Sequence, residues 1–298
     1  MTLKALYQRL PIVRELRTIR DFLAEIHCNL TGITRRLSEI AQIQQTKLMA
    51  LQLPIHPRYG DHLRLLRYSA QTFSQGGEDG IVAEICRRIG VKSGTFLEIG
   101  IGDGLENNTT LLLTQGWRGW WIDANRQQVS AVEKSFHKWI SSGRLKVACA
   151  EITADNVMSH LRDLSIPVEV DCFSLDIDRN TYWVWRAMKE FRPKIAVIEY
   201  NASRPPNVEW EVDYSPSSVW NGTIVFGASL KSLEVLAADF GYSLVGCTLE
   251  GINAFFVRND LVGGNFKDPF TAENHYEPPR YALCSLRGHP RAVGDQLF

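Results

Sequence analysis

The sequence predicts an α/β protein: a mostly parallel, doubly wound sheet with antiparallel last strands, preceded by an α-helical coiled coil. From about residue 78, short apolar segments alternate with amphipathic ones, which is typical of parallel strands joined by crossover helices. Three closely spaced glycines follow the first apolar strand segment. Upstream, leucine and isoleucine recur at alternating steps of three and four residues, the pattern of a coiled coil.

The composition is that of an ordinary globular protein. The 298 residues are 45% hydrophobic and 22% charged, enough for one sizeable core and an appended segment. The formal net charge is zero, so we expect no nucleic-acid partner. No apolar run approaches the length of a membrane span, and charges interrupt the first apolar stretches, so neither a transmembrane helix nor a signal peptide is predicted. The six cysteines form no C-x-x-C pair and indicate reduced thiols in a cytoplasmic protein.

Residues 1–52 are predicted to form an N-terminal coiled-coil oligomerisation helix. Its repeat consists of Leu16, Ile19, Leu23, Ile26, Leu30, Ile33, Leu37 and Ile40. Leucine at heptad position a and isoleucine at d favour a trimer or tetramer. Two other interpretations stay open. The helix could pack on its own domain. Alternatively, its basic residues could contact anionic lipid, although Glu15, Asp21 and Glu25 reduce the positive charge of this segment. These basic residues are Lys4, Arg9, Arg14, Arg17 and Arg20.

A boundary between two domains is predicted after the helix. Residues 53–70 contain two prolines and a glycine and are predicted to be a linker, so residues 71–298 form the second domain. The acids at the start of its first helix, Glu78 and Asp79, are explained by helix capping. Capping explains neither Gln75 nor the double glycine that follows it.

The centre of the second domain is predicted to be a strand, a glycine turn, a helix and a second strand. The strand Thr95–Ile99 precedes the glycines, and the later strand Arg118–Ile122 ends at Asp123. The glycines are Gly100, Gly102 and Gly104. Glycine lets the backbone approach a ligand without a Cβ in the way, and an acid in the position of Asp123 can accept both hydroxyl protons of a ribose. The stretch therefore predicts the first half of a nucleotide-binding unit.

The spacing of the glycines separates several kinds of nucleotide site. A dinucleotide site has the pattern G-x-G-x-x-G, whereas this chain has E-x-G-x-G-x-G from Glu98 to Gly104. No phosphate-binding lysine follows, which excludes a P-loop. The spacing and the acid before it are similar to the first motif of S-adenosylmethionine-dependent methyltransferases. The alternative is a tight turn that binds no ligand, which the placement of Asp123 about 20 residues further on disfavours.

Further strands and helices follow in alternation. Strands are predicted at Leu145–Ala150, Asp171–Ile177, Ile195–Ile198, Tyr242–Thr248 and Asn253–Arg258, and helices at Val129–Ile140, Val157–Leu164, Tyr182–Phe191 and Ser229–Phe240. Glu151 follows the third strand, where the amino group of an adenine could be met.

Polar side chains also follow the fourth and fifth strands. They are Asp176, Asp178, Glu199 and Asn201. Ends of adjacent strands at the carboxyl edge of such a sheet face one crevice, and carboxylates with an amide oxygen suit Mg²⁺ or Mn²⁺. In the alternative interpretation the two aspartates cap the following helix and the glutamate pairs with Arg179 or Arg204.

Several of these segments together resemble one family, the FkbM-type methyltransferases, over roughly residues 70–260. They are Gln75 with Glu78-Asp79, FLEIGIGDG, Asn108-Thr109, GWWIDAN, SLDIDRNTYWVW and IEYN, and the tail segment NHYEPPRY is similar to relatives as well. The resemblance implies a seven-stranded Rossmann-like methyltransferase sheet and methyl transfer from S-adenosylmethionine to a hydroxyl, commonly of a sugar in a polysaccharide, glycolipid or natural product. The chain departs from the commoner pattern in having Asp123 where many relatives have Glu.

The resemblance also implies roles for individual residues. Cofactor contacts are expected from Gln75, Asp79, Glu98, Gly100, Gly102, Gly104, Asn108, Thr109, Asp123, Glu151 and Asp176. Asp178 and Asp176 are the candidate catalytic acids, and His275 in the tail is the histidine to test as a base. As in catechol O-methyltransferase, to which the strand-end acids are similar, Asp178, Glu199 and Asn201 are the candidate ligands of Mg²⁺ or Mn²⁺.

The expected function is therefore a cytoplasmic S-adenosylmethionine-dependent O-methyltransferase with a sugar or glycan acceptor. Its coiled coil would make it a homo-oligomer and could also serve a secondary contact, with a glycosyltransferase or the inner face of a membrane. Two other functions compete. One is an NAD-dependent oxidoreductase on the same fold, which the glycine spacing disfavours. The other is a non-catalytic coiled-coil scaffold with a degenerate methyltransferase domain, which the intact acids disfavour.

Overall fold

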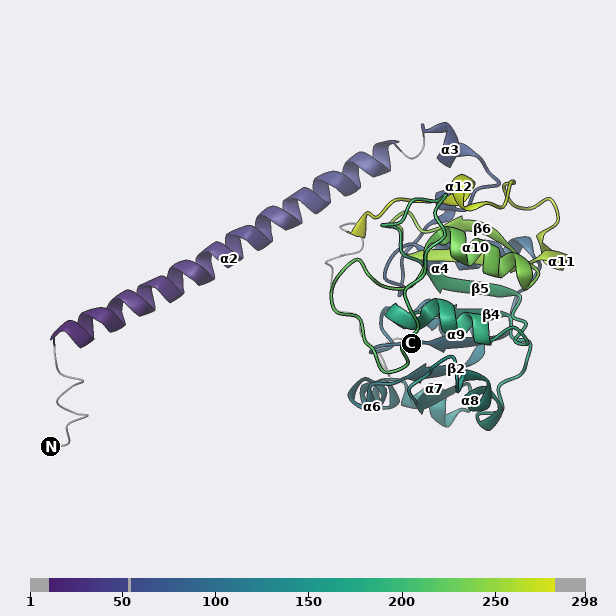
Figure 1. Cartoon of the computed structure of the whole chain (residues 1–298), viewed down its shortest axis with the longest axis horizontal. Helices are drawn as coiled ribbons and strands as arrows, with labels where there is room; N and C mark the ends of the chain where they lie inside the picture. The colour runs from purple at the N-terminus through teal and green to yellow at the C-terminus, as the bar shows by residue number, and fades with distance from the viewer. Residues whose placement is uncertain (1–10, 53–54, 282–298) are drawn as a thin grey trace. The chain divides into compact units, whose positions relative to one another are not determined.

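A computed structural model describes residues 11–52 and 55–281 of the chain (Figure 1). The chain divides into two compact units, Met1–Gln52 and Leu53–Phe298. Lys4 and Arg9 of the predicted basic segment lie outside the described residues. None of the helices in the described ranges is both long and apolar enough to cross a bilayer.

The first unit contains one long helix, α2 (Pro11–Gln52), of 42 residues. The predicted heptad residues all lie on this helix, and their side chains are exposed, from 38% for Ile26 to 61% for Leu37. The helix that the heptad pattern requires is therefore present. Its association into a coiled coil stays a prediction.

Most of the predicted linker belongs to the second unit. It contains the short helix α3 (Pro57–Gly60) and a 3₁₀ turn, η1 (Leu66–Tyr68). Leu65 is only 2% exposed, and the guanidinium of Arg58 lies 3.1 Å from the buried carboxylate of Glu277. The leucine joins the core beside strand β6 (Tyr242–Cys247), and the ion pair, buried on the glutamate side, connects the segment to the tail. A composition with two prolines and a glycine reveals neither contact.

The second unit is built on a seven-stranded sheet in the order β3-β2-β1-β4-β5-β7-β6. The strands are β1 (Thr95–Ile99), β2 (Arg118–Asp123), β3 (Leu145–Cys149), β4 (Cys172–Leu175), β5 (Ile195–Glu199), β6 (Tyr242–Cys247) and β7 (Asn253–Arg258). The first five strands are parallel, and β7 is antiparallel to both β5 and β6. This confirms the predicted mostly parallel, Rossmann-like sheet and its antiparallel last pair.

Helices cover both faces of the sheet. They are α4 (Glu78–Arg88), α5 (Thr110–Thr114), α6 (Arg126–Ser135), α7 (His137–Ser141), α8 (Val157–Asp163), α9 (Thr181–Ala187), α10 (Leu230–Asp239), α11 (Asn259–Val262) and α12 (Ala272–His275). Alternate residues of a strand point to opposite faces. In β1, accordingly, Phe96 joins the core with residues of α4, α5 and α6, whereas Leu97 joins the core with residues of α8, α9 and α10.

Two predicted elements differ from the structure in ways that bear on the site. The fourth strand ends at Leu175 rather than Ile177, because the backbone turns into a 3₁₀ helix, η2 (Asp178–Asn180), with Asp178 at a φ of +57°. The predicted helix after β2 is two helices, α6 and α7, separated at Phe136, whose ring lies edge-on to Trp121. The early end of β4 brings two aspartates to the carboxyl edge of the sheet.

The turn after β1 depends on close contact with the chain after β4. Gly100 has a φ of +87°, and a Cβ built there would lie 1.6 Å from the carbonyl oxygen of Asp176. Gly102 has a φ of +53°, but nothing lies within 4 Å of a Cβ built there. Gly100 is therefore required by contact as well as by conformation, whereas Gly102 is required by conformation alone.

We predict that Gly100→Ala lowers the free energy of unfolding by about 3 kcal/mol or more, because a strained backbone is combined with overlap against a carbonyl group. Gly102→Ala is the matched control and should cost only about 1–2 kcal/mol, the usual penalty of a left-handed residue with a Cβ. Urea denaturation of the two variants measures the difference. Equal losses would contradict the close contact between the two segments.

Candidate active site

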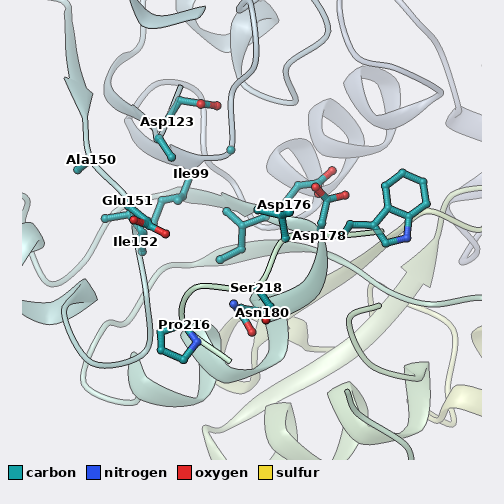
Figure 2. A pocket seen from close by; sticks show the side chains of 15 residues that line it. Ile99, Asp123, Ala150, Glu151, Ile152, Asp176, Asp178, Asn180, Pro216 and Ser218 are labelled. Carbon is teal, nitrogen blue, oxygen red and sulfur yellow. The ribbon is translucent and has the colours of Figure 1, made fainter. Parts of the chain in front are cut away.

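Three adjoining cavities open at the carboxyl edge of the sheet. The β3-side cavity, of about 240 Å³, is lined by Asp123, Glu151 and the loop that carries Pro216 (Figure 2). The glycine-turn cavity, of about 320 Å³, is lined by Glu98, by residues 100–103 and 106–108, and by Gln75. The loop cavity, of about 530 Å³, lies beside Glu199. Asp176 lines all three cavities, so they meet at this residue.

Glu98 fastens the glycine turn to the helix that follows it. Its side chain is 3% exposed and accepts hydrogen bonds from the backbone N–H of Asn108, at 2.9 Å, and of Thr109, at 3.1 Å. The Thr109 hydroxyl also donates to Glu98 and accepts from the indole N–H of Trp121, at 2.8 Å. Burial raises the pKa of Glu98 to about 7, although these hydrogen bonds oppose the shift. Glu98 and Thr109 thus hold the glycine turn and the start of the next helix together through buried hydrogen bonds.

Asn108 does reach the glycine-turn cavity. It lines that cavity, and its amide donates to the hydroxyl of Ser174 at 3.0 Å. The other residues predicted to contact a cofactor that line the same cavity are Gln75, Glu98, Gly100, Gly102 and Asp176. Gly104 does not line it; the Cβ that it lacks would lie 2.9 Å from the ring of Phe136, so this glycine serves packing.

The carboxylate of Asp123 accepts hydrogen bonds from backbone N–H groups and also borders the β3-side cavity. One carboxylate oxygen accepts from the backbone N–H of Ile101, at 3.0 Å, and of Gly102, at 2.9 Å. The other accepts from Asn125 N–H at 2.8 Å. A carboxylate has about four acceptor positions, so about one stays available toward the β3-side cavity. The predicted ribose contact is therefore one hydrogen bond unless the turn moves.

Glu151 lies across the same cavity from the strand ends. Figure 2 shows Glu151 and Ile152 on one side of the cavity and the carboxylates of Asp176 and Asp178 on another. Asn180, at the end of η2, completes the lining on that side. This cavity combines apolar walls with acceptors at its ends, a composition suited to a nucleoside.

Three carboxylates form an acidic cluster where the cavities meet. One oxygen each from Asp176, Asp178 and Glu199 lie within 4.8 Å of one another. Burial, and next the charge of Asp178, raise the pKa of Asp176 to about 6. Burial and the charge of Asp176 raise the pKa of Glu199 well above its ordinary value. Like charges this close require a shared proton or a cation to offset their repulsion.

The cluster fits a hard divalent cation. Carboxylate oxygens are the preferred ligands of Mg²⁺ and Mn²⁺. The Oε2 atom of Glu199 is buried and has no hydrogen-bond donor among the described residues. Arg179 and Arg204 do not neutralise Glu199: Arg179 donates to the carbonyl of Asp213, and Arg204 stacks on Trp210 with its guanidinium carbon 4.0 Å from the ring centroid.

Asn201 differs from its predicted role as a metal ligand. Its amide donates to the carbonyls of Ile224, at 2.9 Å, and Phe226, at 2.8 Å, and its oxygen accepts from the N–H and hydroxyl of Ser203. All of its polar groups are used, so it is not placed to bind a cation. It instead fixes the loop whose residues Ile224 and Phe226 line the loop cavity.

Asp79 also differs from its predicted contact with a cofactor. One oxygen accepts from the backbone N–H of Thr72, Phe73 and Ser74 at 2.6–2.9 Å, and the side chain is only 2% exposed. Asp79 therefore holds the loop that precedes Gln75. Gln75 itself lies where the glycine-turn and loop cavities meet.

His275 is not placed to act as a base. It is 4% exposed, its Nε2 lies 2.9 Å from the carbonyl oxygen of Lys267, and it lines none of the three cavities. Burial, and next the charge of Arg64, lower its pKa to about 3, so the imidazole is neutral. The tail contributes a different residue to the loop cavity, Tyr281.

Several lining residues were not predicted to bind a ligand. They are Asn253 and Gln128 in the glycine-turn cavity, Asn180 in the β3-side cavity, and Ile224, Phe226 and Ile252 in the loop cavity. Asn253 is the first residue of β7. It lies at the site because β7 pairs with β5, which puts Asn253 opposite Glu199. Trp220, in the long loop between β5 and α10, lines both the β3-side and loop cavities.

No protein-family model and no curated protein matches the chain. Solved structures with a similar chain course include an S-adenosylmethionine-dependent methyltransferase from Clostridium acetobutylicum, with 14% identity and a TM-score of 0.37 over 72% of this chain and 98% of that one. Another is a methyltransferase from Aquifex aeolicus, with 14% identity and a TM-score of 0.34 over 58% and 86%. A third is the O-methyltransferase NcsB1 from neocarzinostatin biosynthesis, solved with S-adenosylmethionine and a naphthoic acid, with 14% identity and a TM-score of 0.34 over 55% and 49%. Similarity at this level does not by itself assign an activity to the chain.

The buried position of Glu98 predicts a pH dependence of stability. Because its pKa is raised from 4.5 to about 7 on folding, its contribution is most favourable below pH 4.5 and is lost as the pH rises toward 7. The unfolding free energy of wild type relative to Glu98→Gln should therefore fall by up to about 3 kcal/mol between pH 5 and pH 7.5. Urea titrations across this range measure the change, with Glu133→Gln on the exposed side of α6 as the control. A constant difference would contradict the raised pKa.

The hydrogen bonds of Asn201 predict a defect in the loop. Asn201→Ala leaves two carbonyls without their amide donor and should cost about 1–3 kcal/mol in unfolding free energy. Asn221→Ala removes a side chain that accepts hydrogen bonds from Thr223 of the same loop and should cost less than about 1 kcal/mol. Hydrogen exchange of residues 222–226 should accelerate in the first variant alone. Equal protection in both would show that Asn201 does not hold the loop.

Proposed function

We propose that the protein is an S-adenosylmethionine-dependent methyltransferase that methylates a hydroxyl group. The observation that supports this most directly is the meeting of the three cavities at Asp176, directly beside the acidic cluster. A donor with two chemically different ends and a separate acceptor require three compartments that converge on the reacting atoms. The turn E-x-G-x-G-x-G borders two of these compartments.

The residues that line the cavities suit the two ends of the donor. The β3-side cavity would take the adenosine end, with Asp123 accepting from a ribose hydroxyl and Glu151 from the adenine amino group. The glycine-turn cavity would take the amino-acid end, with backbone N–H groups and Gln75 as partners. S-adenosylmethionine, when bound, supplies a methyl group on a positively charged sulfur. The carboxylate of Asp176 at the junction would attract that charge.

The acidic cluster suits the removal of a proton from an alcohol. Asp178 is the most exposed of the three carboxylates, and burial raises its pKa. It would accept the hydroxyl proton while the oxygen forms a bond to the methyl carbon and the carbon–sulfur bond breaks. We further propose that Asp176, Asp178 and Glu199 can hold Mg²⁺ or Mn²⁺, which would lower the pKa of the hydroxyl.

The loop cavity supports a neutral acceptor. Its lining includes Trp220, Phe226 and Tyr281 and three carboxylates, but no lysine, arginine or histidine among the described residues. A phosphate or carboxylate on the acceptor would be repelled there, whereas the C–H faces of a sugar can pack on aromatic rings. We therefore propose an uncharged sugar hydroxyl of a polysaccharide, glycolipid or natural-product precursor as the acceptor.

We predict that S-adenosylhomocysteine binds the full-length protein in calorimetry and that NAD⁺ does not. Asp123→Ala should weaken S-adenosylhomocysteine binding about 10- to 100-fold, because a charge-assisted hydrogen bond is lost and the turn is loosened. Preference for NAD⁺ would instead indicate an oxidoreductase. Unchanged affinity in the variant would remove Asp123 from the proposed site.

We predict that Asp178→Asn abolishes transfer of a labelled methyl group from S-adenosylmethionine into a glycan extract, while S-adenosylhomocysteine binding changes less than about threefold. If a cation takes part, EDTA lowers wild-type transfer, Mn²⁺ restores it, and Asp178→Asn and Glu199→Gln lose Mn²⁺ binding. Glu209→Gln, outside the cluster, is the control. Full transfer by Asp178→Asn would reject its proposed role, and wild-type binding without any transfer would favour a scaffold.

A further inference from the structure

Helix α2 carries an apolar stripe that the described part of its own unit does not cover. Eight leucine and isoleucine side chains, from Leu16 to Ile40, repeat at heptad positions a and d, and each is at least 38% exposed. At 1.5 Å per residue the stripe extends for about 36 Å. Soluble proteins rarely expose a continuous apolar surface of this kind, so a partner surface is required.

We propose that the occupant of this stripe is the same stripe of further copies of the chain, in a parallel bundle of three or four helices. Residues that repeat strictly every seven positions follow the seam of a left-handed supercoil, whereas a helix packed on a globular domain carries a wider apolar face. In parallel copies at the same register each a residue meets a residues and each d meets d. Leucine at a and isoleucine at d favour more than two strands.

A further apolar side chain widens the stripe and favours a bundle of more than two helices. Phe22, at heptad position g beside Leu23, is 60% exposed. In a dimer the g positions lie at the margin of the interface, whereas in trimers and tetramers they lie closer to the buried centre. Burial of Phe22 therefore adds to the reason for a higher oligomer.

Charge supports the parallel direction. Glu15 occupies position g and Arg20 the e position five residues later, so in parallel helices Glu15 of one copy faces Arg20 of its neighbour. An antiparallel alignment of the same stripe instead brings the apolar Phe22 opposite the charged Arg36. Within one helix Arg20 pairs with its exposed neighbour Asp21, at 2.7 Å, and such an exposed ion pair costs little to exchange.

The number of copies is tested on the full-length protein by multi-angle light scattering and sedimentation equilibrium. We expect three or four copies for wild type and a monomer for Ile26→Asp, because a charge at the centre of the seam cannot be buried. Cys28→Asp is the matched control: it puts the same charge two residues away at position f, on the opposite side of the helix, and should leave the mass unchanged. Thermal unfolding of the second unit should be the same in both variants.

Several outcomes would overturn the proposal. They are a monomeric wild type across the concentration range, an unchanged mass for Ile26→Asp, and a monomer that instead floats with vesicles of phosphatidylglycerol. None of these depends on the proposed methyl transfer, since neither the mass nor the binding to vesicles requires a reaction.

The direction of the helices is tested by cross-linking. In a Cys28→Ser background, Leu16→Cys puts a thiol at an a position near one end of the stripe. In a parallel bundle two such thiols meet and should form a covalent dimer on mild oxidation. In an antiparallel bundle they lie about 36 Å apart, so an assembled protein that does not cross-link would overturn the parallel arrangement.

Discussion

The site depends on the close approach of two chain segments, the turn after β1 and the end of β4. With no Cβ at Gly100, the backbone of the turn lies against the carbonyl of Asp176. The same contact brings the side chain of Asp176 to the border of all three cavities. The parallel pairing of β1 with β4 fixes this position, since Ile99 lies opposite Leu175 in the register. The order of the strands in the sheet thus determines both the conformation of the turn and the position of Asp176 in the site.

Several carboxylates of the second unit are partly or fully buried, and they have different roles. Glu98 and Asp79 accept backbone N–H groups and hold loops, as a helix cap does elsewhere. Asp79 and Glu199 each also keep a buried oxygen without a donor among the described residues. A buried acceptor without a partner costs free energy, and Glu199 differs from Asp79 in that one of its oxygens lies within 4.8 Å of oxygens of two other carboxylates. The loop-holding acids are therefore distinguished from the acidic cluster by their bonds to backbone N–H groups and by deeper burial, since Glu98 and Asp79 are 3% and 2% exposed whereas Asp178 is an exposed residue.

The sequence predicted the alternation of elements, the glycine turn and the edge at which the polar residues gather. It did so because periodicity and strand-end positions are local properties. It did not predict which of these residues face a cavity. Asn201 follows β5 as a ligand would, but its amide is used by the loop at Ile224 and Phe226. His275 was singled out from the tail by residue type alone, and the structure buries it against Lys267. Asn253 reaches the site only because β7 lies beside β5, which depends on long-range pairing.

The position of Asp176 has a consequence for how molecules occupy this protein. A single side chain borders every compartment, so a charge that arrives in one compartment changes the electrostatic environment of the others. Occupants would then not bind independently: a cation or a sulfonium that favours the ionised carboxylate alters the affinity for the next arrival. By thermodynamic reciprocity the second occupant changes the affinity of the first by the same factor. The geometry therefore favours a mutually dependent filling of the compartments.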